Sequence, residues 1–191
     1  MKRIAFLLAL LAVPAVAGLR PVTIDDLMKL RSIVDVKIAP DGEQVAYVVS
    51  TPSVEKNEHQ VALYLISAKG GTPKRLAESL RILNAPLPSP RLRWKPDGSA
   101  VSVLAIGGER PQVFAIPLSG DAPEQITKSP EGVFAYDWSP DGKSLAFLTR
   151  ESPTPEEAKR RAMVNRVHLP DKPARLAVQP LGGELRFVSS P

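Results

Sequence analysis

Apolar and polar residues alternate in three similar stretches of the chain. These are VKIAPDGEQVAYVVS from Val36, LRWKPDGSAVSVLAI from Leu92 and YDWSPDGKSLAFLTR from Tyr136. In each stretch, two alternating runs flank Pro-Asp-Gly, a triplet that favours a type I turn with Pro at the second position and Gly at the fourth. The pattern predicts three β-hairpins built on the same turn. Each hairpin should carry a glycine of positive φ, at Gly42, Gly98 and Gly142.

A second pair of strands is predicted after each hairpin. The segments are ALYLISAKGGTPKRLA from Ala62, QVFAIPLSGDAPEQIT from Gln112 and RLAVQPLGGELRFVSS from Arg175, and each has a glycine-containing turn between two apolar runs. One repeat therefore has four short strands, which is the content of a propeller blade. The shared turn recurs after 56 and then 44 residues, from Asp41 to Asp97 to Asp141. Periods of about 40 to 50 residues are typical of propellers and not of helical repeat arrays.

The fold class expected from these repeats is all-β: a partial β-propeller of about three four-stranded blades. The blades should cover about 33–80, 91–128 and 133–191, with a helical insertion over 151–172 and a lead-in with a short helix over 18–32. A plain β-sandwich would explain the strands but not the recurring turn. Because propellers typically have 4 to 8 blades, three blades should form an open arc with apolar faces uncovered at both ends.

Two sets of equivalent residues stand out in the repeats. The residue two before the turn proline is Ile38, Trp94 or Trp138, and each is expected to face a core. The third turn position is Asp41, Asp97 or Asp141, where a short carboxylate accepts hydrogen bonds from nearby backbone N–H groups. This capping role is favoured over catalysis or calcium binding for the three aspartates.

Helix start signals occur twice. Thr23 followed by Asp26 predicts a short helix in the lead-in. Thr154, Pro155 and Glu157 form a capping box that predicts a helix running to about Val167. Its basic run, Lys159-Arg160-Arg161, is interpreted as a solvated face paired locally with Glu156 and Glu157 and not as a binding site.

The first residues have the order of a signal peptide. Lys2 and Arg3 precede an apolar run of 10 residues, and Ala15-Val16-Ala17 follows as an A-x-A cleavage site. We expect cleavage near Ala17 and a mature chain from Gly18 in the periplasm or outside the cell. The run is half of the roughly 20 residues needed to cross a bilayer, so no stable membrane anchor is expected.

Composition narrows the chemistry. The 191 residues are 43% hydrophobic and 24% charged, with 20 Pro and 12 Gly, which fits a globular chain with frequent turns. The chain has no Cys and two His, His59 and His168, which excludes disulfides and thiol chemistry and gives no metal-ligand pattern. A net charge of +5 is consistent with a mildly basic surface, and no nucleic-acid partner is expected.

The phrase WSPDGKSLAFL resembles the repeat of TolB-like periplasmic propellers and of the N-terminal propeller of prolyl oligopeptidase-family serine peptidases. Two longer passages favour the peptidases. TIDDLMKLRSIVDVKIAPDG, from Thr23 to Gly42, resembles the entry to the first blade in exported acylaminoacyl-peptidase-like or dipeptidyl-peptidase-like members. The stretch from Thr154 to Glu184 resembles a charged helical excursion in those enzymes.

The resemblance implies a propeller that gates peptide access to a hydrolase domain carrying a Ser-Asp-His triad. That domain's G-x-S-x-G motif is absent from the sequence, and the nearest match, around Ser144, follows a hairpin turn and opens a strand. We therefore expect a chain truncated before the hydrolase domain and inactive alone, with no catalytic, cofactor-binding or metal-binding residues. Peptide substrates would be partners of this chain only by way of the missing hydrolase domain. The alternative is a TolB-like scaffold whose partners are envelope proteins.

Overall fold

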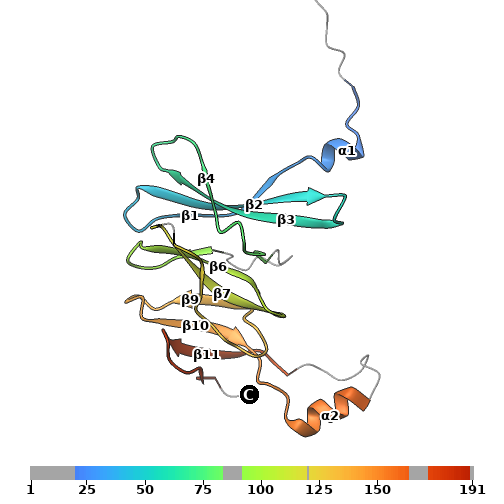
Figure 1. Ribbon diagram of the computed structural model, residues 1–191, viewed down its shortest axis with the longest axis vertical. Helices are drawn as coiled ribbons and strands as arrows, with labels where there is room; N and C mark the ends of the chain where they lie inside the picture. Colours follow the sequence, from blue (N-terminus) through green and yellow to red (C-terminus); the bar gives the residue numbers. More distant parts are fainter. Residues whose placement is uncertain (1–19, 84–91, 120, 164–171, 190–191) are drawn as a thin grey trace, which may run out of the picture.

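The computed structural model describes residues 20–83, 92–119, 121–163 and 172–189. The strands of these residues form three antiparallel four-stranded sheets, which lie one upon another along the long axis of the molecule (Figure 1). Within each sheet the strands follow their order in the sequence. The prediction of a mostly β chain with repeated four-stranded units is confirmed.

Each sheet corresponds to one sequence repeat. The first sheet contains β1 (Ser32–Ile38), β2 (Gln44–Ser53), β3 (Glu58–Ser67) and β4 (Lys74–Leu76). The second contains β5 (Leu92–Trp94), β6 (Ala100–Gly107), β7 (Arg110–Pro117) and β8 (Glu124–Gln125). The third contains β9 (Ala135–Trp138), β10 (Ser144–Thr149), β11 (Arg175–Pro180) and β12 (Arg186–Phe187).

Both expected helices form in the described residues. Helix α1 (Ile24–Leu27) precedes the first sheet, and α2 (Pro155–Met163) is inserted between β10 and β11. The capping box of α2 is present, because the Thr154 N–H donates to the Glu157 carboxylate at 2.7 Å and the Glu157 N–H donates to the Thr154 hydroxyl at 3.2 Å. Neither helix is long and apolar enough to span a bilayer.

Several expectations fall outside the described residues. These are the signal peptide at 1–17 and the end of the second helix, which is expected to run to about Val167. The side chain of Arg161 is likewise not described.

The three Pro-Asp-Gly turns have the predicted geometry. Gly42, Gly98 and Gly142 have φ of 76°, 71° and 67°. The N–H of each glycine donates to the carbonyl three residues earlier, at 2.8 to 2.9 Å. Left-handed backbone strongly favours glycine because a Cβ crowds the neighbouring carbonyl. All three turns lie along one side of the stack, at the left in Figure 1, and the β2–β3, β6–β7 and β10–β11 connections lie along the opposite side, with α2 in the last of these.

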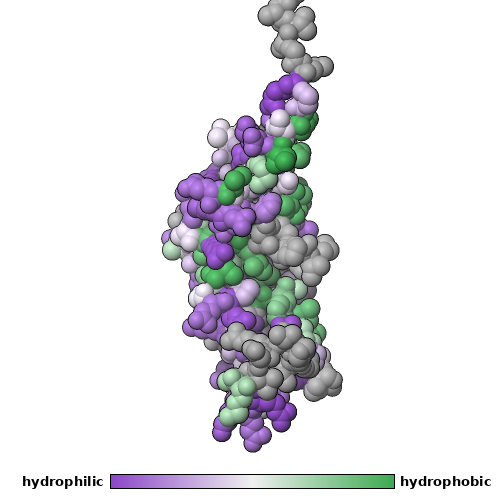
Figure 2. All heavy atoms as spheres, turned by 90° about the vertical axis from the view of Figure 1, so that its right-hand side faces the viewer, coloured by the Kyte–Doolittle hydropathy of each residue, from purple (hydrophilic) through white to green (hydrophobic). Residues whose placement is uncertain are grey.

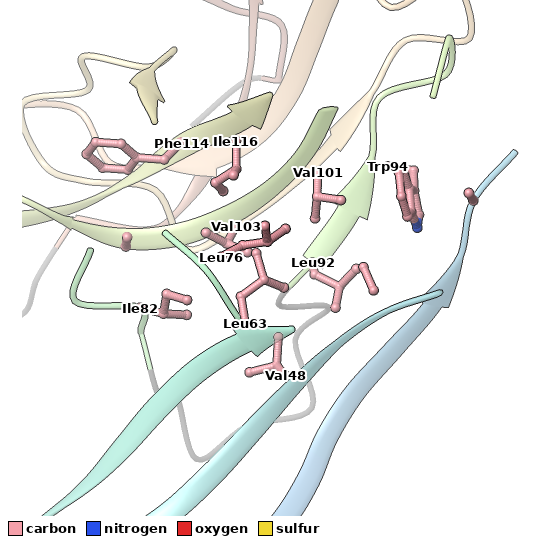
Figure 3. Packing of buried hydrophobic residues seen from close by; sticks show 13 residues of the cluster. Val48, Leu63, Leu76, Ile82, Leu92, Trp94, Val101, Val103, Phe114 and Ile116 are labelled. Carbon is pink, nitrogen blue, oxygen red and sulfur yellow. The ribbon is translucent and has the colours of Figure 1, made fainter. Parts of the chain in front are cut away.

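An apolar core joins the first and second sheets (Figure 3). Val48 and Leu63 come from the first sheet, whereas Leu92, Val101 and Val103 come from the second, and all five are completely buried. Burying one such side chain stabilises the fold by about 1.5–3 kcal/mol. The two sheets are therefore held together mainly by their facing apolar residues.

A separate core joins the second and third sheets. Leu104 and Val113 from the second sheet pack with Tyr136, Leu145 and Phe147 from the third. In β10, Leu145, Phe147 and Thr149 are buried and Leu148 is exposed. This alternation places one face of the strand against the second sheet and the other on the surface.

The two tryptophans at the shared repeat position each reach the preceding sheet. The Trp94 indole N–H donates to the Lys37 carbonyl at 3.0 Å, and the Trp138 indole N–H donates to the Ser102 hydroxyl at 2.9 Å. The prediction that Ile38 also faces a core is wrong, because 61% of its surface is exposed. No sheet among the described residues precedes the first one, so the equivalent position has nothing to pack against.

Both ends of the stack leave apolar side chains exposed. On the third sheet Leu148, Leu176 and Val188 are 39–47% exposed, as expected for a terminal unit. Leu145 and Phe147 of the same sheet face inward, and Trp138 and Phe187 are half-buried. Figure 2 views the side of the stack that carries α2. It shows hydrophilic side chains over α2 at the bottom and hydrophobic side chains near the lead-in at the top.

Candidate functional site

The turn aspartates serve the turns. The Asp41 carboxylate accepts the Glu43 N–H at 2.9 Å, that of Asp97 accepts the Ser99 N–H at 2.9 Å, and that of Asp141 accepts the Lys143 N–H at 3.0 Å. Each carboxylate thus bonds the backbone two residues on, which confirms the capping role. Among the residues described, no group of three or more His, Asp or Glu is arranged to hold a metal ion.

Two of these carboxyl groups are held in the ionised state by local donors. The Lys95 ammonium, 2.8 Å away, and the Ser99 hydroxyl and N–H lower the pKa of Asp97 from 3.8 to about 2. The Ser139 hydroxyl and the Lys143 N–H lower the pKa of Asp141. A carboxyl group with a lowered pKa is a poor proton carrier near neutral pH, so neither group suits general acid–base catalysis.

Ser144 is the first residue of β10, as the sequence predicted. Its N–H donates to the Ser139 hydroxyl at 2.9 Å, and it pairs with Pro180 of β11 in the sheet. A nucleophile elbow instead places the serine in a strained turn between a strand and a helix. The geometry at Ser144 therefore does not match that of a hydrolase nucleophile.

One serine–histidine contact escaped the sequence analysis. The Ser50 hydroxyl lies 3.3 Å from Nδ1 of His59, and the two residues come from the paired strands β2 and β3. Only 5% of Ser50 is exposed, and a nucleophile must reach its substrate beside an oxyanion hole. We interpret the pair as a contact that satisfies a buried hydroxyl.

A groove opens between the second and third sheets on the side of the stack where the strands end in the Pro-Asp-Gly turns. We call it the turn-end groove, and its volume is about 760 Å³, within the range of small-molecule sites. Apolar residues from both sheets form much of its wall. They are Ala100, Ala115, Pro117, Leu118, Ile126, Trp138 and Leu181.

Polar and charged side chains complete the turn-end groove. Lys95, Lys128 and Glu124 contribute charges, while Gln125 and Gln179 contribute amides. Lys95 is paired with Asp97, whereas Lys128 is exposed and forms no ion pair with any described residue. The groove therefore combines an apolar wall with one lysine, Lys128, that has no ion-pair partner in the described part of the chain. Its residues lie in separate repeats, and no sequence motif marks them.

A second cavity, of about 670 Å³, lies between the first and second sheets on the opposite side of the stack. Its lining is mostly polar, with Lys56, His59 and Arg75 among its basic groups. Glu58 also lines it and pairs with Arg81 at 3.5 Å. Cations and acids are thus mixed in this cavity, and it presents no single sign of charge to a ligand.

Polar side chains buried between the second and third sheets form a connected network. The Gln112 amide N–H donates to the Ser129 carbonyl at 2.7 Å, and the Gln112 amide oxygen accepts the Thr127 hydroxyl at 2.9 Å. The Thr149 hydroxyl donates to the Gly132 carbonyl at 2.6 Å. Because these groups are satisfied, the network rigidifies the junction and leaves no reactive group free.

The chain is similar in sequence to part of a known peptidase. No protein-family profile matches the chain. Over 135 residues the chain is 31% identical to dipeptidyl-peptidase 5 of Porphyromonas endodontalis, a match that covers 71% of this chain and 18% of that protein. The chain thus spans about a fifth of the length of this curated relative.

Solved peptidase structures have the same fold over most of the chain. The AtxE2 isopeptidase with Astexin3-dC4 bound matches with a TM-score of 0.63 at 18% identity, covering 88% of this chain and 32% of that one. The acylaminoacyl peptidase of Pyrococcus horikoshii matches with a TM-score of 0.59 at 14% identity, covering 84% and 26%. The sequence match and the shared fold together identify the chain as corresponding to the N-terminal propeller part of a prolyl oligopeptidase-family peptidase.

Proposed function

We propose that the chain is the non-catalytic propeller portion of a periplasmic or secreted serine peptidase of the prolyl oligopeptidase family. In this proposal it restricts the access of peptides to a hydrolase domain. The observation that carries the proposal is the 31% identity to a dipeptidyl-peptidase over 135 residues. The stacked sheets and the lack of a G-x-S-x-G motif in the 191 residues support a non-catalytic role.

The structure favours gating by a rigid wall. Two separate apolar cores join the three sheets, and a buried hydrogen-bond network reinforces the second junction. Close-packed interiors deform little, so a wall of this kind would resist the entry of a folded protein. The wall thereby selects by size and needs no catalytic group of its own.

The test compares two products. One is the 191-residue chain. The other is the complete protein encoded by the reading frame that contains it, tagged at its C-terminus. Both are treated with a fluorescent fluorophosphonate and then assayed on peptide substrates of increasing length. We expect the complete product to be labelled on a serine outside this chain and to lose activity as substrates lengthen, whereas the 191-residue chain is not labelled.

Two results would contradict the proposal. Stoichiometric labelling of Ser144 would show that the chain is itself catalytic. A complete product without a reactive serine that captures envelope proteins would favour the TolB-like scaffold instead. Export is tested by the intact mass of the periplasmic product, which should begin at Gly18.

A further inference from the structure

The wall of the turn-end groove presents apolar surface from three different segments. Ile126 follows β8, Trp138 ends β9 and Leu181 follows β11. The indole N–H of Trp138 already donates to Ser102, so the part of the ring that lines the groove has no donor left to offer. Such a surface suits a bulky apolar side chain.

Gln179 supplies an unused acceptor next to this surface. It is 9% exposed and lines the groove. Its amide N–H donates to the Ile126 carbonyl at 3.4 Å, and no described residue donates a hydrogen bond to its amide oxygen. That oxygen is not among the fully buried atoms, so it is open to a donor from a ligand. A peptide N–H inside the groove would supply that donor.

Lys128 is the lysine of the groove that can meet an anion. It forms no ion pair within the described chain, whereas Lys95 at the wall is paired with Asp97. Glu124 is the single acidic residue among those that line the groove. A carboxylate near Lys128 would therefore gain a charge-assisted hydrogen bond that no carboxylate of the described residues forms with it.

We propose that the turn-end groove binds the C-terminal residue of a peptide. The terminal carboxylate meets Lys128, the last peptide N–H donates to the Gln179 amide oxygen, and an apolar side chain lies against Trp138 and Ile126. A volume of about 760 Å³ is large enough for a chain end of a few residues. This site lies on the opposite side of the stack from α2 and requires no hydrolysis, so it goes beyond the proposed gating function.

The first experiment measures peptide binding to the 191-residue chain by isothermal titration calorimetry. The probes are acetyl-Ala-Ala-Leu with a free carboxylate, the same peptide with a C-terminal amide, and acetyl-Ala-Ala-Gly with a free carboxylate. We expect the leucine acid to bind with a Kd below about 1 mM. The amide and the glycine peptide should each bind several-fold more weakly. Equal affinity for the acid and the amide, or no measurable binding of any probe, would overturn the proposal.

The second experiment locates the site with a matched pair of variants. Lys128→Gln removes the unpaired cation, and Lys143→Gln removes an exposed lysine that does not line the groove. Lys128→Gln should weaken binding of the leucine acid about five-fold or more, and Lys143→Gln should leave it unchanged. Binding of the acid should also shift the indole N–H resonance of Trp138. Unchanged affinity in Lys128→Gln, or no shift at Trp138, would contradict this assignment.

Discussion

The same repeat position is exposed on the outer face of the first sheet and buried at the junction between the first two sheets. Ile38 and Trp94 both stand two residues before a turn proline, yet Ile38 is 61% exposed and Trp94 is 9% exposed. Trp94 also donates a hydrogen bond to the backbone of β1, the strand that contains Ile38. The repeat fixes the position of the side chain, and the presence of a preceding sheet decides whether it is buried.

The turns show the same contrast on a smaller scale. A Cβ at Gly142 would lie 3.4 Å from Cδ of Pro96 in the preceding turn, whereas a Cβ at Gly42 would meet nothing within 4 Å. Both glycines have positive φ. Both turns therefore require a glycine at positive φ, but only Gly142 lies against the proline of a preceding turn.

Truncation at the shared position should separate the two regions most clearly. Trp94→Ala should lower the free energy of unfolding by about 3–5 kcal/mol, because it empties a packed junction. Ile38→Ala should change it by no more than about 0.5 kcal/mol, because the side chain is largely exposed. Urea denaturation followed by circular dichroism measures both. Equal losses for the two variants would mean that the sheets do not stack as described.

Ser102 offers a test of the second junction. Its hydroxyl accepts hydrogen bonds from the Tyr136 hydroxyl at 3.0 Å and from the Trp138 indole, and donates to the Arg93 carbonyl at 3.1 Å. Ser102→Ala should cost about 1–3 kcal/mol of stability, because it leaves buried polar groups without partners. Ser119→Ala, at an exposed loop residue, is the matched control and should cost less than about 0.5 kcal/mol. A neutral Ser102→Ala would show that water replaces the serine.

Substitution of the turn glycines should have a moderate effect. Gly42→Ala and Gly142→Ala should each lower the free energy of unfolding by about 1 kcal/mol, because both introduce a Cβ at positive φ. The contact with Pro96 should make Gly142→Ala at least as costly as Gly42→Ala. Lys143→Ala controls for substitution in the same hairpin. Thermal melts that show no loss in either glycine variant would contradict the turn geometry.

The smallest expected effect is the pH dependence from Asp97. Its pKa in the folded chain is about 2, below the usual value of 3.8, so its contribution to stability is present above about pH 4. That contribution is lost as the pH falls towards 2. Because the side chain is half exposed, we expect it to stay below about 1 kcal/mol. In Asp97→Asn, the loss of stability between pH 4 and 2 should be smaller than in the unaltered chain. Identical acid profiles would contradict the role of the Lys95 and Ser99 contacts.

The hairpins could be predicted because their determinants are local. Alternation and Pro-Asp-Gly specify strands and turn within about fifteen residues, and the φ values of Gly42, Gly98 and Gly142 agree. The turn-end groove could not be predicted, since Lys128, Trp138 and Gln179 meet only after two sheets have packed. Ile38 shows the intermediate case, because its place in the repeat was clear but its burial depended on a neighbouring sheet.

The stacking of the sheets is tested most directly by hydrogen exchange at the two indole N–H groups. Both tryptophans donate across a junction, Trp94 to the Lys37 carbonyl and Trp138 to the Ser102 hydroxyl. In an NMR exchange experiment both indole signals should be protected relative to free tryptophan, with the largely buried Trp94 exchanging more slowly than Trp138. Rapid exchange of both signals under conditions where the strands remain folded would show that the sheets do not pack on one another.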